Sequence, residues 1–249
     1  MSLRRFRRAV ALVLALALVI LRFWLLRLRG PLTLERRALW LQQSARGILA
    51  ALGVHYRVEG RPPTRGLVVS NHLSYLDILI LSAAMPCFFV AKVEVGGWPF
   101  FGKAARSGGT IFVDRTSLAS ATSVAEQMTE RLKLPIPVPV LLFPEGTSTD
   151  GSQLLRFHSR LIDPATSIGA PITTACVRYV IDGGVEEREL CWFGDTEFLP
   201  HLLKTLGTPG FYAEVTFGEP RVYPDRRTAA DQTHAEIEAM RSGAVLSLQ

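Results

Sequence analysis

The amino-acid sequence predicts an α/β fold: a mixed, largely parallel sheet flanked by helices and preceded by an N-terminal helix pair. From residue 54 onward, short apolar or alternating segments recur between helical segments, and repeated β–α units favour a sheet covered by helices. Residues 1–53 instead hold one long apolar run and one amphipathic segment. The 249 residues suffice for a domain with a sizeable core.

The first predicted helix is built on the apolar run 9–21, which continues beyond Arg22 with residues 23–26. The thirteen residues of the run span about 20 Å as a helix, against about 30 Å of hydrocarbon. Arg22 and Trp24 suit a membrane–water interface, because a long cation snorkels and an indole is half wet. A cleaved signal peptide is the alternative, but basic residues at 27–29 stand where its cleavage site would be.

Positive charge is concentrated in the same region. Residues 1–66 contain thirteen arginines against Glu35 and Glu59, whereas the remaining residues contain 15 basic and 20 acidic side chains. This asymmetry fits contact with anionic lipid headgroups; a nucleic-acid-binding arm is the alternative, disfavoured by the apolar run. We therefore expect residues 1–53 to form membrane-anchoring helices, at the cytoplasmic face of the cell membrane.

A second helix is predicted after Gly30-Pro31, because apolar residues recur at helical spacing. The stripe can pack on the core, on the first helix or in the bilayer surface, and it consists of Leu34, Ala38, Leu41, Ala45, Ile48 and Leu52.

Residues 54–249 are expected to form the globular domain. Their predicted strands are 54–59, 66–70, 87–91, 110–113, 138–143, 172–180, 189–193 and 211–217, and their predicted helices are 76–84, 118–132 and 228–241.

The first chemically notable cluster follows the strand 66–70. His72 and Asp77 are five residues apart, which is about 140° on one continuous helix. They meet only if His72 precedes the helix and Asp77 lies in its first turn, and Ser74 suits the N-cap of such a helix. A carboxylate on one imidazole nitrogen leaves the other as a general base. A capping box beside an incidental histidine is the alternative.

Two further clusters also follow apolar strands, where α/β proteins usually place their sites. The strand 110–113 leads to Arg115, a residue type suited to bidentate binding of phosphate. Strand 138–143 leads to Glu145, Gly146 and Thr147, a tight polar loop able to hold a polyol or a developing oxyanion. An exposed ion pair and a surface turn are the respective alternatives.

In this order, the clusters resemble the glycerophospholipid acyltransferase family, especially the 1-acylglycerol-3-phosphate acyltransferases. The similarity covers residues 54–217, and the stretches that carry it are 71–77, 91–94, 98–100, 109–115, 143–147 and 170–172. It implies transfer of a fatty acyl chain from acyl-coenzyme A or acyl carrier protein to the hydroxyl of 1-acylglycerol-3-phosphate (lysophosphatidate), giving phosphatidic acid.

The resemblance also implies roles for the residues. His72 would deprotonate the acceptor hydroxyl and Asp77 would orient His72. Arg115 and Lys92 would hold the acceptor phosphate, while Glu145, Gly146 and Thr147 would line the glycerol site. Membrane lipids are the expected surroundings, and neither a cofactor nor a nucleic-acid partner is implied. No metal is implied, since no His/Cys/Asp cluster has metal-ligand spacing.

Two departures from the family pattern bear on the acceptor. An arginine usually follows the third motif, where this chain has residues 148–150 (Ser-Thr-Asp), and Phe-Lys-x-Gly is replaced by residues 157–160. Members that act on lyso-ornithine lipid show a similar Glu-Gly-Thr-Ser/Thr run, so this lipid is the second candidate acceptor. A hydrolase or thioesterase, and a non-catalytic lipid-binding membrane protein, are the remaining alternatives.

Overall fold

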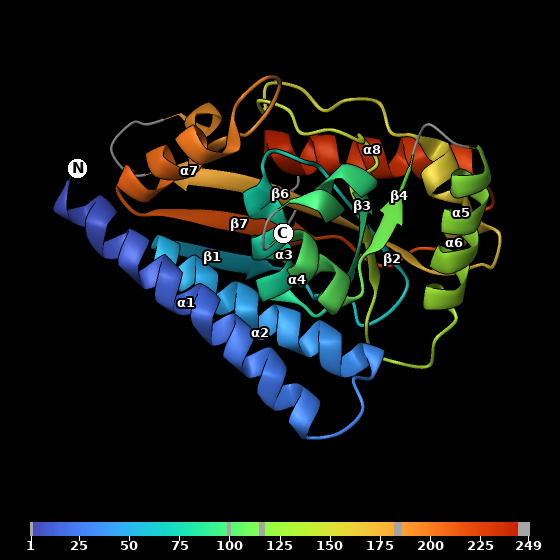
Figure 1. The fold of residues 1–249 in the computed structure, drawn as a ribbon. Coiled ribbons are helices and arrows are strands. Elements are labelled where there is room, and N and C mark those ends of the chain that lie inside the picture. Colours follow the sequence, from blue (N-terminus) through green and yellow to red (C-terminus); the bar gives the residue numbers. More distant parts are fainter. Residues whose placement is uncertain (1, 99–100, 115–117, 182–185, 244–249) are drawn as a thin grey trace.

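A mixed seven-stranded sheet forms the centre of the computed structural model, which describes residues 2–98, 101–114, 118–181 and 186–243 (Figure 1). The strand order is β1-β7-β6-β2-β5-β3-β4, and every neighbouring pair is parallel except β6 and β7. The strands are β1 (Val54–Glu59), β2 (Leu67–Ser70), β3 (Phe88–Lys92), β4 (Ile111–Val113), β5 (Val140–Leu142), β6 (Ile172–Ile181) and β7 (Phe211–Phe217).

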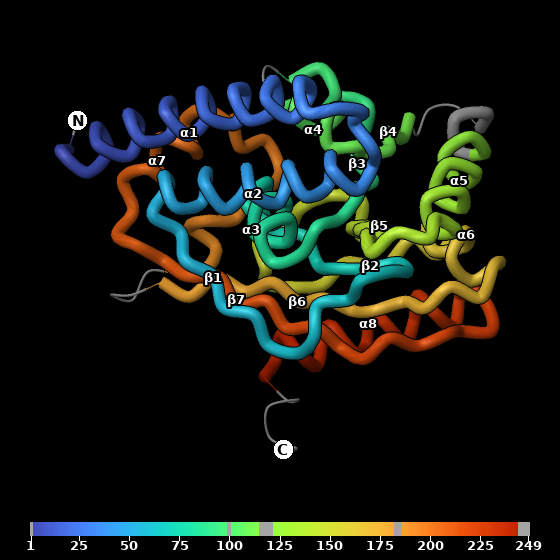
Figure 2. Tube along the Cα trace, turned by 90° about the horizontal axis from the view of Figure 1, so that it is seen from below, coloured from blue at the N-terminus to red at the C-terminus, as the bar shows by residue number. Residues whose placement is uncertain are grey.

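Helices cover both faces of this sheet, which confirms the predicted fold class (Figure 2). They are α1 (Leu3–Leu28), α2 (Leu34–Leu52), α3 (Tyr75–Ala84), α4 (Phe101–Gly108), α5 (Leu118–Leu132), α6 (Asp163–Thr166), α7 (Phe198–Gly207) and α8 (Arg226–Ser242), with short 3₁₀ helices η1 (Val93–Gly97), η2 (Ser159–Leu161) and η3 (Glu187–Leu190).

Strand β2 divides the core between the two faces. Its side chains alternate, as strand geometry requires. Val68 packs in the core shared with α2 and α3, whereas Leu67 and Val69 pack in the core shared with α5, α6 and α8. A strand that is apolar on both faces is typical of a parallel sheet buried between helical layers.

The two N-terminal helices lie side by side against the domain but bury different amounts of surface (Figure 2). Seven residues of α2 are buried, whereas Val19 is the single buried residue of α1. Trp40 of α2 joins them, because its indole donates to the Val19 carbonyl at 3.2 Å and its ring lies 4.9 Å from that of Phe23. Helix α2 is therefore part of the core, and α1 is a superficial layer upon it.

The N-terminal end of α1 is also tied to α7. Arg8 Nη1 donates to the Thr208 carbonyl at 2.6 Å and to the Leu206 carbonyl at 3.4 Å, and Arg4 Nη1 donates to the Gly207 carbonyl at 3.4 Å. These carbonyls lie at the C-terminal end of α7, where a cation is favoured by the helix dipole. We call these contacts of Arg4 and Arg8 the α1–α7 latch.

One predicted strand is wrong. Residues 189–193 form the end of η3 and an irregular segment, because their amides bond elsewhere: Cys191 N–H donates to the Arg188 carbonyl and Trp192 N–H to the Leu73 carbonyl. Helices α4 and α7 were not predicted. The other predicted elements are present with small shifts at their ends.

Candidate active site

The predicted motifs follow neighbouring parallel strands. Strands β2, β5, β3 and β4 are adjacent and parallel, so their carboxyl ends lie at one edge of the sheet, where α/β proteins place ligands. Residues 71–77 follow β2 and residues 143–148 follow β5, while Lys92 ends β3. We call this the catalytic edge.

His72 and Asp77 meet at this edge as the spacing predicts. Nδ1 of His72 lies 2.9 Å from Oδ2 of Asp77. His72 precedes α3, whereas Asp77 is the third residue of that helix after the N-cap Ser74. A carboxylate fixes the tautomer that carries the proton on Nδ1, so Nε2 is left as the proton acceptor.

Asp77 is fully buried and receives several donors. Its Oδ2 accepts the Leu73 amide at 2.6 Å and the Ser74 amide at 2.9 Å in addition to His72, while Oδ1 accepts the Tyr179 hydroxyl. A buried carboxylate requires such partners, because an unpaired charge in the interior is strongly unfavourable. These contacts fix the orientation of the carboxylate toward the imidazole.

Glu145 supports the same loop through its backbone. Oε1 accepts the His72 amide at 2.8 Å and Oε2 accepts the Leu155 amide at 2.9 Å. Burial raises the pKa of the Glu145 carboxyl, although the two amides act in the opposite direction. Both oxygens therefore hold protein backbone, so the geometry favours a positioning role over the predicted contact with the acceptor glycerol.

A cavity of about 400 Å³ opens beside His72. The predicted residues Lys92, Gly146 and Thr147 line it, whereas Arg115 lies outside the described residues. The other residues that line the cavity are Ile78, Phe89, Val90, Ala91, Glu94, Val95, Trp98, Val113, Leu142, Phe143, Ser148, Leu161 and Trp192.

A second cavity, of about 100 Å³ and almost wholly apolar, adjoins the first. Both are lined by Ile78, Phe89, Ala91, Val95 and Trp98. From these shared walls the second cavity extends under the N-terminal helices, where Val19 of α1 and Trp40 of α2 line it. The catalytic edge thus has a cavity with polar and apolar walls beside His72, and this cavity continues into an apolar one beneath α1 and α2.

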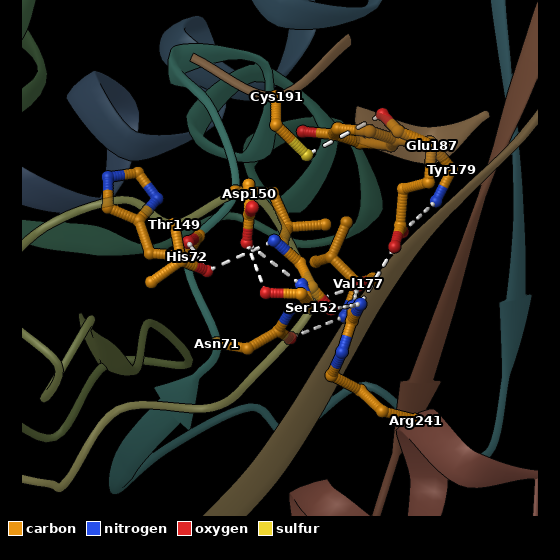
Figure 3. Close-up of polar contacts among 12 residues, drawn as sticks. Asn71, His72, Thr149, Asp150, Ser152, Val177, Tyr179, Glu187, Cys191 and Arg241 are labelled. Atoms are coloured by element: carbon orange, nitrogen blue, oxygen red, sulfur yellow. Dashed lines mark hydrogen bonds and ion pairs between the residues drawn. The ribbon is translucent and has the colours of Figure 1, made fainter. Parts of the chain in front are cut away.

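Sequence reasoning missed several supports of this site. Phe143 stacks on the His72 ring with centroids 4.0 Å apart. Asn71 exchanges two hydrogen bonds with the backbone of Val177 at 2.8 and 2.9 Å (Figure 3). Trp192 accepts the Ser148 hydroxyl on its carbonyl at 2.5 Å. Asn71 and Phe143 are the first residues of the recognised stretches 71–77 and 143–147, which is a usable signal for their importance, whereas Trp192 carries none.

An α/β fold whose sheet edge presents an imidazole, oriented by a buried carboxylate beside a cavity, is typical of enzymes in which a general base removes a proton from a hydroxyl group or water. The reaction depends on what the cavity holds.

Comparison with known proteins identifies the family. The sequence profile described as Acyltransferase matches residues 54–178. A lyso-ornithine lipid O-acyltransferase of Rhodobacter capsulatus is 37% identical over 201 residues, which cover 78% of this chain and 72% of the relative. The chain belongs to the acyltransferase family, which confirms the predicted enzyme class.

Two other comparisons extend this result. A 1-acyl-sn-glycerol-3-phosphate acyltransferase of Neisseria meningitidis is 36% identical over 143 residues, 56% of this chain and 55% of that relative. The crystal structure of the 1-acyl-sn-glycerophosphate acyltransferase PlsC from Thermotoga maritima superposes with a TM-score of 0.71 at 17% identity, covering 99% of this chain and 97% of the other. The latter comparison establishes the fold.

Proposed function

We propose that this chain transfers a fatty acyl group from an acyl thioester, carried by coenzyme A or acyl carrier protein, to the free hydroxyl of a lysolipid. The His72–Asp77 contact of 2.9 Å carries this proposal. Nε2 of His72 takes the hydroxyl proton as the hydroxyl oxygen attacks the thioester carbonyl. The tetrahedral intermediate then collapses, the C–S bond breaks, and the thiolate takes the proton from His72.

The adjoining cavities support a lipidic substrate. An acyl chain needs apolar surroundings, and the walls of the second cavity are nearly free of polar groups. We place an acyl chain in the apolar cavity and the reacting hydroxyl beside His72 in the larger one.

For the acceptor, we propose lyso-ornithine lipid as the first candidate. Its headgroup carries an ammonium and a carboxylate, and the described charged side chains of the larger cavity are Lys92 and Glu94, one of each sign. Ser148, which replaces the arginine expected from the family pattern, adds no cation and donates its hydroxyl to Trp192. Lys92 and Arg115 hold the carboxylate in this proposal, and Glu94 holds the ammonium.

Lysophosphatidate is the second candidate, and it is the acceptor that the sequence resemblance first indicated. The similarity to the Neisseria enzyme favours it. Arg115 and Lys92 would then share the phosphate, since a guanidinium binds phosphate oxygens in pairs.

We also propose that α1 attaches the protein to a membrane. This helix has 26 residues and is long and apolar enough to span a bilayer. Almost none of its apolar stretch is buried against the rest of the protein. Its exposed large apolar side chains are Leu3, Phe6, Val10, Val13, Leu14, Leu18, Ile20, Leu21, Trp24, Leu25 and Leu28. On α7, tied to α1 by the latch, Leu199 and Leu203 are exposed as well. An amphipathic surface flanked by arginines fits the face of an anionic membrane.

An acceptor comparison tests the proposed function. Purified protein in mixed micelles receives acyl-coenzyme A or acyl carrier protein, with lyso-ornithine lipid, lysophosphatidate or no acceptor. We expect ester formation only with a lysolipid, and kcat/KM at least about 10-fold higher for lyso-ornithine lipid, the size of one lost charge contact. Preference for lysophosphatidate would reverse the order of the two candidates. Thioester cleavage at an equal rate without acceptor would instead indicate a thioesterase.

A further inference from the structure

Tyr179 contacts Asp77 of the catalytic pair from β6, the strand that pairs with β2 in the sheet. It lies on β6, 102 residues beyond Asp77, and its hydroxyl donates to Oδ1 of Asp77. The Tyr179 side chain is 5% exposed and does not line the cavity beside His72. Its hydroxyl therefore reaches Asp77 but not a bound substrate.

The two oxygens of Asp77 are held in different ways. Oδ2 accepts Nδ1 of His72 together with the amides of Leu73 and Ser74, all from the loop and helix start that carry Asp77 itself. Among the residues that the structure describes, it is the Tyr179 hydroxyl that donates to Oδ1. Local contacts thus fix the position of Oδ2, and the long-range contact with Tyr179 at Oδ1 fixes the rotation of the carboxylate.

The position of Tyr179 is itself fixed by charged partners (Figure 3). Oε1 of Glu187 accepts the Tyr179 amide at 2.8 Å, and Oε2 of Glu187 accepts Nη2 of Arg241 at 2.7 Å. Arg241 also donates to the Val177 carbonyl at 3.1 Å and to the Gly151 carbonyl at 2.8 Å. This network ties α8, η3 and β6 together behind the catalytic edge.

We propose that Tyr179 is a positioning residue that orients the Asp77 carboxylate and tunes the basicity of His72. This inference rests on the proposed general-base role of His72. A phenol that donates to a carboxylate withdraws negative charge from it, so the carboxylate stabilises the imidazolium less. It also holds the carboxylate in the plane that the imidazole requires.

The phenol stays protonated in this setting. Burial raises the pKa of Tyr179 well above its ordinary value, and the Asp77 carboxylate adds to the effect. The titratable and charged groups around the pair come from several elements, and they are His72, Glu145, Glu187, Cys191 and Arg241.

The first test is Tyr179→Phe, with Tyr56→Phe as the matched control. Tyr56 also donates its hydroxyl within the protein, to the Ala83 carbonyl at 3.2 Å, but it does not contact the site. We expect Tyr179→Phe to lower kcat about 10-fold, the effect of losing one hydrogen bond to a charged group, with the acceptor KM unchanged. The acidic limb of the kcat/KM profile should move to higher pH, because the His72 imidazolium becomes more stable.

The second test replaces Tyr179 with 3-fluorotyrosine, a more acidic phenol of nearly the same size. A stronger donor should move the same limb to lower pH, opposite to the phenylalanine variant. This replacement decides the question even if Tyr179→Phe does not fold. If Tyr179 had a purely structural role, the acidic limb of the kcat/KM profile would not move in either protein.

A readout without turnover separates this inference from the proposed function. Titration of ¹⁵N-labelled histidines by NMR in detergent gives the His72 ring pKa directly, and the His72→Ala spectrum assigns the signal. We expect the His72 ring to titrate at higher pH in Tyr179→Phe and at lower pH in the fluorotyrosine protein. An unchanged ring pKa in both proteins overturns the inference, as does an unchanged kcat in Tyr179→Phe. Absent acyl transfer together with the expected ring shifts would count against the proposed function alone.

Discussion

The catalytic edge and helix α1 differ in what they bury: the edge buries charged side chains, whereas α1 leaves large apolar side chains exposed. At the edge, the carboxylates of Asp77 and Glu145 are buried and both oxygens of each accept hydrogen bonds. Along α1, large apolar side chains are exposed and only Val19 is buried. Buried, hydrogen-bonded carboxylates fix the orientation of the groups around them, whereas an exposed apolar helix suits the contact with lipid proposed above. Chemistry and location should therefore respond to different substitutions.

The largest expected effect is that of His72→Ala. Loss of the general base should lower kcat by at least about 10²-fold, while sedimentation with vesicles stays at the wild-type level. His55→Ala is the control, because His55 is an exposed histidine on β1. Initial rates and a vesicle assay on the same preparations separate the two properties. Turnover near wild type in His72→Ala would remove this residue from its assigned role.

Next in size is the effect of placing charge on α1. The double variant Leu14→Asp, Leu21→Asp changes side chains that are 65% and 53% exposed. We expect vesicle binding to fall at least about 10-fold, because carboxylates resist transfer into the bilayer interface. The pH profile of the dissolved enzyme in detergent should not change.

Val222→Asp is the matched control for this experiment, since Val222 is 62% exposed but lies away from α1. Equal vesicle binding by the α1 variant and the wild type would assign the attachment to other elements. Deleting residues 1–30 is a coarser version of the test, because it also uncovers Trp40. We expect the sheet domain to remain folded in that truncation.

A smaller effect is expected from Arg115→Ala, which concerns acceptor affinity. We predict that the acceptor KM rises about 10-fold while the donor KM is unchanged, in keeping with loss of a charge-assisted contact. Arg115→Lys should recover part of the loss, because an ammonium cannot make paired contacts. Arg61→Ala, on the exposed loop after β1, is the control. Equal acceptor KM values in the two alanine variants would exclude Arg115 from the headgroup site.

The smallest kinetic effect is expected for Glu145→Gln, which tests whether Glu145 positions the His72 loop or contacts the acceptor. One oxygen of the amide still accepts a backbone N–H, but the amide nitrogen faces the other donor. We expect a loss of stability of about 2 kcal/mol, or a Tm lower by about 5 °C, with the acceptor KM unchanged. The exposed Glu238→Gln is the control for calorimetry. A large rise in acceptor KM would restore Glu145 to the substrate site.

Much of the fold was predictable because local patterns determine it. The apolar stripe from Leu34 to Leu52 lies on α2, and strands β1 and β7 begin and end where they were predicted. Helix α7 was missed, and residues 189–193 were wrongly predicted to be a strand, because tertiary contacts determine the conformation of both segments. The Trp192 amide pairs with Leu73, far away in the sequence, rather than with a neighbouring strand.

In the candidate site, too, the contacts set by local sequence were predictable and those set by tertiary structure were not. The His72–Asp77 contact was predictable, since five residues and a helix N-cap determine it. Tyr179 was not predictable, because the sheet brings it to Asp77 from a strand 102 residues away. The backbone contacts of Glu145 were not predictable for a related reason: its partners are backbone amides, which a motif of side chains does not reveal. Its predicted contact with the acceptor stays a prediction.

The latch between Arg8 and the end of α7 has a consequence for how this enzyme meets its substrate. The N-terminal end of the proposed anchor is bonded to the catalytic domain, so we expect His72 to stay near the lipid surface when α1 is bound to a membrane. Encounters with lysolipid then take place in two dimensions. Rates should follow the mole fraction of lysolipid in the surface, so adding inert phospholipid at constant bulk concentration should slow the reaction by surface dilution.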